Sequence, residues 1–142
     1  MSDRAFVDTN ILVYARDRAA GAKQVRAEAL IRQLWETRRG RVSIQVLNEY
    51  FVTVTQKLKP GMARDDAWSD LAALQAWDPV PMDWKLLERG RGVQQQHALS
   101  WWDALIVAAA QAAGCDVLYS EDLADGAVLG GVRVVNPFAA RM

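Results

Sequence analysis

The chain divides into short apolar runs and longer segments in which apolar residues recur with helical spacing. Short apolar runs predict buried strands at 5–7, 42–44, 117–119 and 132–135, and a brief one at 80–82. Helical spacing predicts a short helix at 11–14 and longer helices at 23–38, 45–58, 64–76, 83–96 and 100–113. Gly40, Pro60 and Gly114 are helix-breaking residues and are expected to end three of these helices.

Strands that alternate with helices indicate βαβ units, whose strands form a parallel sheet with helices packed against it. The pattern therefore predicts an α/β sandwich. In a parallel sheet of this kind, ligands bind beyond the carboxyl ends of the strands. That edge of the sheet is where we expect the chemistry of the protein.

The composition fits a folded domain and limits the chemistry that it can perform. The chain has 142 residues, of which 51% are apolar and 24% are charged, so one domain with a sizeable core is expected. The single histidine, His97, and the single cysteine, Cys115, exclude a two-histidine nuclease, an internal disulfide and a thiolate-rich zinc site. Any hydrolytic chemistry must therefore use carboxylates, hydroxyls, lysine or backbone groups.

The sequence gives no sign of a membrane span or a signal peptide. The longest apolar run, at 104–110, has seven residues, whereas a membrane helix needs about 20. The first four residues do not begin a basic segment that an apolar one follows. We therefore expect a cytoplasmic protein. The formal net charge of zero provides no overall basic field for attracting nucleic acid.

Three aspartates are predicted to lie at the carboxyl edge of the sheet. Asp8 follows the strand at 5–7, Asp122 follows the strand at 117–119, and Asp103 opens the helix that precedes this second strand. Each also has a structural explanation: Asp8 fits a helix N-cap, Asp103 a first-turn acid, and Asp122 an ordinary polar turn. Their predicted convergence on one edge favours a shared site.

Three other acids could also belong to the site, although their positions in the sequence indicate this less clearly. Glu49 lies at the border of the apolar arc of its helix, where a solvated glutamate is also common. Glu121 and Asp125 flank Asp122, and either could replace it as the inward-facing residue. We favour Asp122 because Ser120, two residues earlier at the strand exit, could steady its carboxylate.

Clustered carboxylates point to a divalent cation. Like charges in one place repel one another and raise each other's pKa unless a cation offsets them. Oxygen ligands suit Mg²⁺ or Mn²⁺ rather than Zn²⁺. An ion held in this way can activate water and stabilise an in-line displacement at phosphorus.

The motifs of the chain resemble those of the PIN domain family and, more narrowly, those of bacterial VapC-type toxin nucleases. The resemblance rests on the segments 6–12, 48–49, 102–110 and 118–123, which occur in order and with typical spacing. It implies a three-layer α/β/α sandwich with a short-stranded central parallel sheet, as a single PIN-like nuclease domain over 1–142. The acids of the family motifs fall on Asp8, Glu49, Asp103 and Asp122.

The resemblance further implies a metal-dependent endoribonuclease, usually a homodimer, that a cognate antitoxin protein inhibits. We hypothesise that Glu49 assists three aspartates that bind one or two Mg²⁺ or Mn²⁺ ions, namely Asp8, Asp103 and Asp122. Water activated by the metal would attack a phosphodiester bond of RNA. The residues expected to orient these acids are Thr9, Asn10 and Ser120.

Alternative activities fit only part of the pattern. A phosphoryl-transfer hydrolase with a nucleophilic aspartate usually has a second aspartate where this chain has Asn10. A receiver domain has its acid pair after the first strand, whereas the pair Glu121-Asp122 comes late. A catalytically silent PIN-like module that only binds an antitoxin or another protein stays open as the alternative function.

Tryptophans and arginines outside the motifs allow weaker predictions. Trp68, Trp77 and Trp84 are expected to pack in the core, and the alternative is an apolar groove for an antitoxin helix. Several arginines could contact RNA phosphates, although solvated positions in loops and at helix ends are the commoner role. They are Arg16, Arg18, Arg38, Arg39 and Arg41.

Overall fold

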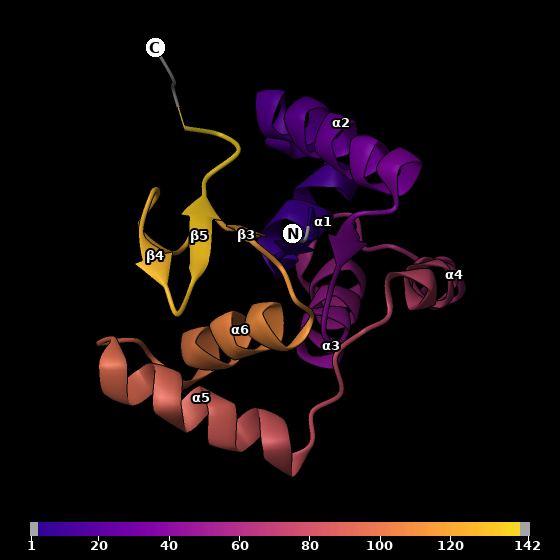
Figure 1. Ribbon diagram of the computed structural model, residues 1–142. Helices are drawn as coiled ribbons and strands as arrows, with labels where there is room; N and C mark the ends of the chain where they lie inside the picture. The colour runs from indigo at the N-terminus through magenta and orange to yellow at the C-terminus, as the bar shows by residue number, and fades with distance from the viewer. Residues whose placement is uncertain (1–2, 140–142) are drawn as a thin grey trace.

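The computed structural model of the protein describes residues 3–139 and has a five-stranded sheet at its centre (Figure 1). Its strand order is β2-β1-β3-β5-β4. The strands are β1 (Ala5–Val7), β2 (Gly40–Arg41), β3 (Val117–Tyr119), β4 (Val128–Leu129) and β5 (Val132–Val135). All neighbours pair in parallel except β4, which is antiparallel to β5 at the edge. The predicted α/β class with a mainly parallel sheet is confirmed.

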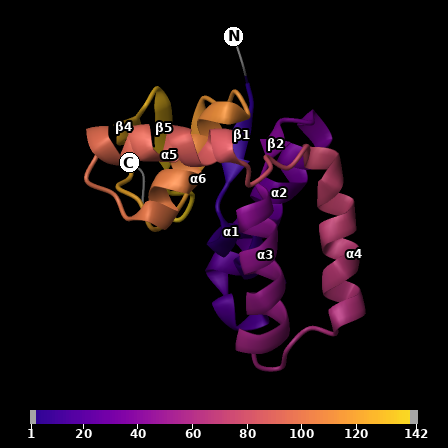
Figure 2. The same ribbon diagram turned by 90° about the horizontal axis from the view of Figure 1, so that it is seen from below.

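Helices cover both faces of this sheet. In Figure 1, α2 lies above the sheet while α5 and α6 lie below it, and Figure 2 shows α3 and α4 beside each other on the side of α1. The helices are α1 (Thr9–Arg16), α2 (Ala22–Thr37), α3 (Ile44–Val52), α4 (Arg64–Leu74), α5 (Trp84–Gln96) and α6 (Trp101–Ala112). Short turns complete the chain: η1 (Arg18–Ala20), the π-helical η2 (Thr53–Lys57) and η3 (Gln75–Trp77). The three layers predicted from the sequence are present.

The register between β1 and β3 determines which side chains meet at the carboxyl edge. Val7 pairs with Tyr119, and the backbone N–H of Asp8 donates to the carbonyl of Tyr119 at 3.0 Å. Since the two strands run parallel, Asp8 and Ser120 leave the sheet beside each other. All of β1 is buried, so a one-residue slip would move its side chains to the opposite faces of the sheet.

Helix α6 brings Asp103 to the same edge, because it precedes β3 and runs back toward the start of that strand. Its N-cap is Ser100, whose hydroxyl accepts a hydrogen bond from the backbone N–H of Asp103 at 3.1 Å. The helix is buried from residue 104 to residue 110. Helix α5 packs closely on it at Gly90, where an added Cβ would lie 2.7 Å from a methyl carbon of Leu105.

The second strand and the helix after it differ from the prediction. A strand was expected at 42–44, but Ser43 caps α3 by accepting a hydrogen bond from the N–H of Val46, so the helix begins at Ile44. The brief strand expected at 80–82 is reduced to one bridge between Ser43 and Val80. Helix α3 ends at residue 52, because the β-branched run at 52–55 is a poor α-helix former.

Two features were missed or misplaced. The hairpin β4–β5 was not predicted, although its two-residue loop, Gly130-Gly131, has positive φ at both positions, as such turns require.

Core packing is confirmed for Trp77, which is 3% exposed. It is wrong for Trp68 and Trp84, which are 64% and 71% exposed because both lie on the outer sides of their helices.

Within residues 3–139, no helix combines the length and the apolar character needed to cross a lipid bilayer. The expectation that no signal peptide begins the chain falls partly on residues 1 and 2, which lie outside the described residues.

Gly40 and Gly92 offer a matched test of this packing. A Cβ at Gly40 would lie 2.6 Å from ring atoms of the buried Trp77, so we expect Gly40→Ala to lower the free energy of unfolding by about 1–3 kcal/mol. A Cβ at Gly92, inside α5, would meet nothing within 4 Å, and Gly92→Ala should stabilise by roughly 0.5–1 kcal/mol. Urea unfolding measures both, and equal effects of the two substitutions would contradict the described packing.

Candidate active site

Asp8 is the most deeply buried acid of the carboxyl edge. Its side chain is 7% exposed, and it caps α1 because Oδ1 accepts a hydrogen bond from the N–H of Thr9 at 2.8 Å. Its second oxygen, Oδ2, accepts from the hydroxyl of Ser120 at 2.8 Å. The structural explanation given for Asp8 is therefore correct, and the carboxylate also faces the loop that carries the other candidates.

Ser120 joins the two strand exits. It is fully buried, and its hydroxyl donates to Asp8 and accepts a hydrogen bond from the N–H of Asp122 at 3.2 Å. We expected this hydroxyl to steady the carboxylate of Asp122; it holds the backbone of Asp122 and the carboxylate of Asp8 instead. The carboxylate of Asp122 is oriented by Asn10, whose Nδ2 donates to its Oδ2 at 3.0 Å.

Glu49 is held from two sides at the same edge. Thr9 donates its hydroxyl to Oε2 of Glu49 at 2.9 Å, and Gln45 donates Nε2 to Oε1 at 2.9 Å. The residue is exposed, as a helix-rim glutamate would be, yet both of its oxygens are engaged. Sequence reasoning missed Gln45, although its position one helical turn before Glu49 was the available signal.

The acids of this edge lie close enough to influence one another. The pKa of Asp8 is raised to about 6, mainly by burial and in smaller part by the charges of Asp122 and Glu49, while the hydrogen bonds from Ser120 and Thr9 act in the opposite direction. Burial also raises the pKa of Asp122, with added repulsion from Asp103, Glu121 and Glu49. All four predicted acids thus belong to one electrostatic cluster.

The acids flanking Asp122 have other partners. Glu121 points to α1 and α2, where it accepts a hydrogen bond from Tyr14 at 2.5 Å and pairs with Lys23. Although partial burial raises the pKa of Glu121, these two partners lower it overall. Asp125 accepts the backbone N–H of Asn136 at 2.9 Å. Both acids therefore have contacts away from the cluster, and Asp122 is the one that faces it.

The carboxylate oxygens of the clustered acids are ligands of the kind that a hard divalent cation such as Mg²⁺ prefers. No lysine or arginine of the described chain lowers the pKa of Asp8 or of Asp122. Beside Glu49, the buried Oε1 of Gln45 has no hydrogen-bond partner among the described residues. Within residues 3–139, however, no three Asp, Glu, His or Cys side chains are already arranged as a set of metal ligands. Binding would therefore require side-chain rotation.

Three of the five arginines considered for phosphate contact have other contacts in the structure, as the commoner role of such arginines suggests. Arg39 contacts the first residue of β1, since its carbonyl accepts from the N–H of Ala5 at 2.9 Å, and Arg41 is the last residue of the neighbouring β2. They lie at the amino edge of the sheet, opposite the acids. Arg16 forms a two-pronged ion pair with Asp70 of α4. Phosphate contact at the acidic edge is therefore not supported for these three arginines.

Taken together, the fold and the site define an α/β domain with an acidic cluster at the carboxyl edge of a short parallel sheet. The PIN domain family model matches residues 5–124. The chain belongs to the PIN domain family, which confirms the resemblance seen in its motifs.

Solved structures share this fold. A toxin–antitoxin complex from Klebsiella pneumoniae matches with 24% identity and a TM-score of 0.66, over 96% of this chain and 99% of that one. FitAB bound to a DNA fragment matches with 17% identity and a TM-score of 0.72, over 97% and 98%. Mycobacterium tuberculosis VapC20, described as a toxin that cleaves the sarcin–ricin loop, matches with 20% identity and a TM-score of 0.59, over 83% and 89%. No curated protein sequence matches significantly.

Asp8→Asn tests the electrostatic cost of the cluster. Folding raises the pKa of the Asp8 carboxyl from 3.8 to about 6, so between these pH values the carboxyl is ionised in the unfolded chain and protonated in the folded one. The free energy of unfolding therefore falls as the pH rises through this window. With metal removed by EDTA, we expect Asp8→Asn to be more stable than the wild type at pH 8 by up to about 3 kcal/mol.

The difference should shrink as the pH falls through this window and disappear below about pH 3, where the carboxyl is protonated in both states. The Asn oxygen can still accept from Thr9, so the cap of α1 is kept. Urea unfolding across pH measures the effect. An Asp8→Asn protein that is equally destabilised at pH 4 and pH 8 would show that lost hydrogen bonding outweighs relieved desolvation, contrary to this account.

Proposed function

We propose that the protein is a Mg²⁺- or Mn²⁺-dependent endoribonuclease and the toxin component of a type II toxin–antitoxin pair. The observation that carries this proposal is the hydrogen-bonded gathering of acids at the carboxyl edge of a PIN domain, through Ser120 on one side and Thr9 on the other. The structural neighbours that are toxins or toxin–antitoxin complexes support the narrower toxin assignment.

The metal would be held by Asp8, Asp103 and Asp122. When bound, it would neutralise charge on the phosphate and make an attacking water more acidic. The buried Asp8 is fixed by two hydrogen bonds, so it would form the rigid side of the site. Asp103 and Asp122 are more accessible and can reorient by side-chain rotation alone.

The remaining polar residues would position the reacting groups. Glu49, exposed and held by Thr9 and Gln45, is suited to accept a proton from the attacking water. Asn10 keeps the carboxylate of Asp122 directed at the cluster, and Ser120 fixes the distance between the two strand exits. Cleavage would break a P–O bond of the RNA backbone while water adds to phosphorus.

Cleavage of labelled RNA tests this function. We expect the wild type to cut RNA with Mn²⁺ and not with EDTA. Asp8→Asn and Asp122→Asn should each lower the rate about 100-fold or more, because each removes a charged ligand of the metal. Asp125→Asn is the matched control, because it removes an acid of the same loop that contacts Asn136 rather than the cluster.

A far-UV circular dichroism spectrum must show that the variants are folded. Metal-independent cleavage, or an Asp8→Asn enzyme that cuts at the wild-type rate, would contradict the proposal. A folded wild type that never cleaves but binds its partner would favour the alternative, a catalytically silent binding module.

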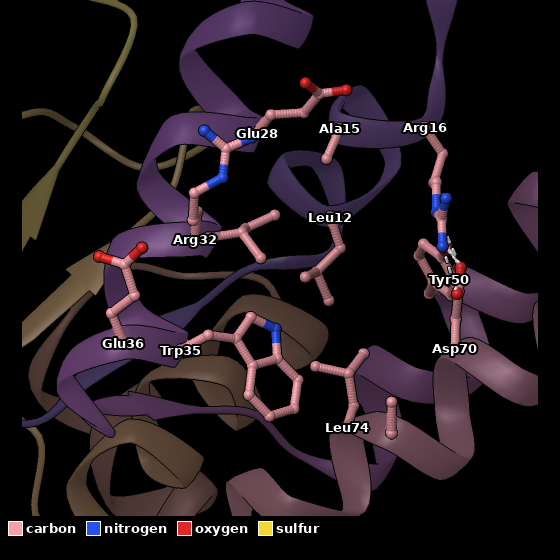
Figure 3. A pocket seen from close by; sticks show the side chains of 12 residues that line it. Leu12, Ala15, Arg16, Glu28, Arg32, Trp35, Glu36, Tyr50, Asp70 and Leu74 are labelled. Atoms are coloured by element: carbon pink, nitrogen blue, oxygen red, sulfur yellow. Dashed lines mark hydrogen bonds and ion pairs between the residues drawn. The ribbon is translucent and has the colours of Figure 1, made fainter.

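We propose that the antitoxin partner binds a groove between α1, α2, α3 and α4. This groove has a volume of about 610 Å³, an apolar floor and charged side chains at its rim (Figure 3). The floor includes Leu12, Ile31, Trp35 and Leu74, and the rim includes Arg16, Glu28, Arg32, Glu36 and Asp70. An amphipathic helix with mixed charges on its flanks fits such a surface.

Trp35 lines this groove and is 39% exposed, so its fluorescence should change when the partner binds. Binding of the protein encoded by the neighbouring gene should shift the tryptophan emission of the wild type to shorter wavelength, because the indole becomes buried. Trp35→Phe should lose most of this shift, whereas Trp68→Phe, which alters an indole outside the groove, should keep it. The reverse order would place the partner elsewhere.

We further propose that the protein acts in the cytoplasm as a homodimer, as is usual in the family it resembles. The lack of a membrane-spanning helix within residues 3–139 is compatible with this location. Sedimentation of the purified chain tests the dimer, and a monomer at micromolar concentration would contradict it.

A further inference from the structure

A second pocket lies at the end of the molecule opposite the acidic cluster. It has a volume of about 370 Å³ and lies at the amino edge of the sheet. The residue before β1, the end of β2, the segment that leads into α5, the first turns of α5 and the end of α6 line it. Ala113, which lines the pocket, is ten residues after Asp103 along α6, so the helix separates the two by about 15 Å at a rise of 1.5 Å per residue.

Cationic side chains reach this pocket from three separate parts of the chain. Arg4 comes from the residue before β1, Arg41 from β2, and Lys85 and Arg89 from α5. Two acids, Asp78 and Asp83, also line the pocket, so positive charge exceeds negative by two. The formal neutrality of the whole chain thus conceals a basic concavity and an acidic cluster at opposite edges of the sheet.

Within residues 3–139, three of the four cations of the pocket have no carboxylate partner, whereas Arg4 donates to the carbonyl of Ala113 at 3.0 Å. Arg41 donates to the backbone carbonyls of Gly40 at 2.8 Å and Arg38 at 3.2 Å, which are neutral partners. Among the described residues, no carboxylate lies within ion-pair distance of Arg41, Lys85 or Arg89. Asp83 caps α5 through the N–H of Leu86. The pocket therefore retains donors and charge that an anion could use.

Bringing these cations together has an electrostatic cost. Lys85 and Arg89 stand four residues apart on α5, where like charges repel each other and destabilise the helix. Arg41 and Arg4 also lie near one point, since both act on the thiol of the buried Cys115, whose pKa burial raises to about 12. Cations gathered from distant segments are typical of a site that binds a multiply charged anion.

We propose that this pocket is a binding site for a phosphate-bearing ligand of nucleotide size. Guanidinium groups bind phosphate oxygens through paired N–H donors, and Lys85 would add a point charge. The volume is sufficient for a nucleoside phosphate or for the terminal nucleotide of an RNA strand. The site does not depend on the acids at the opposite edge, so it stands whether or not the protein cleaves RNA.

Isothermal titration of the full chain in EDTA with adenosine diphosphate tests the site. We expect saturable, salt-sensitive binding that Arg89→Gln and Lys85→Gln each weaken about tenfold, because each removes a charge-assisted hydrogen bond. Arg91→Gln is the matched control: it removes an exposed arginine of the same helix that does not line the pocket. Asp8→Asn should bind as the wild type does.

The source of the phosphate is distinguished by two oligoribonucleotides that differ only in a 5′-phosphate. If the phosphorylated strand binds more tightly than the other strand and Arg89→Gln removes this difference, the site accepts an RNA end. If Arg89→Gln weakens only the binding of adenosine diphosphate, the site accepts free nucleotides. Either result supports the proposal. Absence of binding by the wild type for every probe, or equal weakening by Arg91→Gln, would overturn it.

Discussion

The hydrogen bond from the hydroxyl of Ser120 to the carboxylate of Asp8 is the contact on which the acidic edge depends. It joins the exits of two neighbouring parallel strands, and the same hydroxyl accepts the N–H of Asp122. A short buried strand cannot by itself hold an acid in place, because burial disfavours the charged carboxylate. The two hydrogen bonds to Asp8 offset part of that cost and fix its orientation.

The rest of the cluster is arranged around this fixed acid. Thr9 follows Asp8 directly and reaches across to Glu49 on α3, while Asn10 reaches to Asp122 in the loop after β3. Three consecutive residues, 8–10, therefore connect to two distant segments of the chain. The acids repel one another, and this repulsion destabilises the metal-free fold. A bound divalent cation would remove the repulsion, so the same acids affect both the stability of the fold and the proposed chemistry.

Much of this arrangement could be predicted, because the strands and the capping residues carry local signals. The alternation of strands and helices along the chain places Asp8, Asp103 and Asp122 at one edge, and the caps at Ser100 and Asp83 follow standard helix-start patterns. Contacts between distant segments were not predictable in the same way. Nothing local indicates that Glu121 turns to Lys23, or that exposed helix faces carry Trp68 and Trp84, since those outcomes depend on how the layers pack.

Binding of a divalent cation by the acids at the carboxyl edge can be tested directly by crystallography. A crystal grown or soaked with Mn²⁺ and measured near the manganese absorption edge locates such an ion directly. We expect an anomalous peak among Asp8, Asp103 and Asp122, with the side chains of Asp103 and Asp122 rotated toward it. A fully ordered acidic edge without such a peak, or a peak only at another acidic surface, would contradict this expectation.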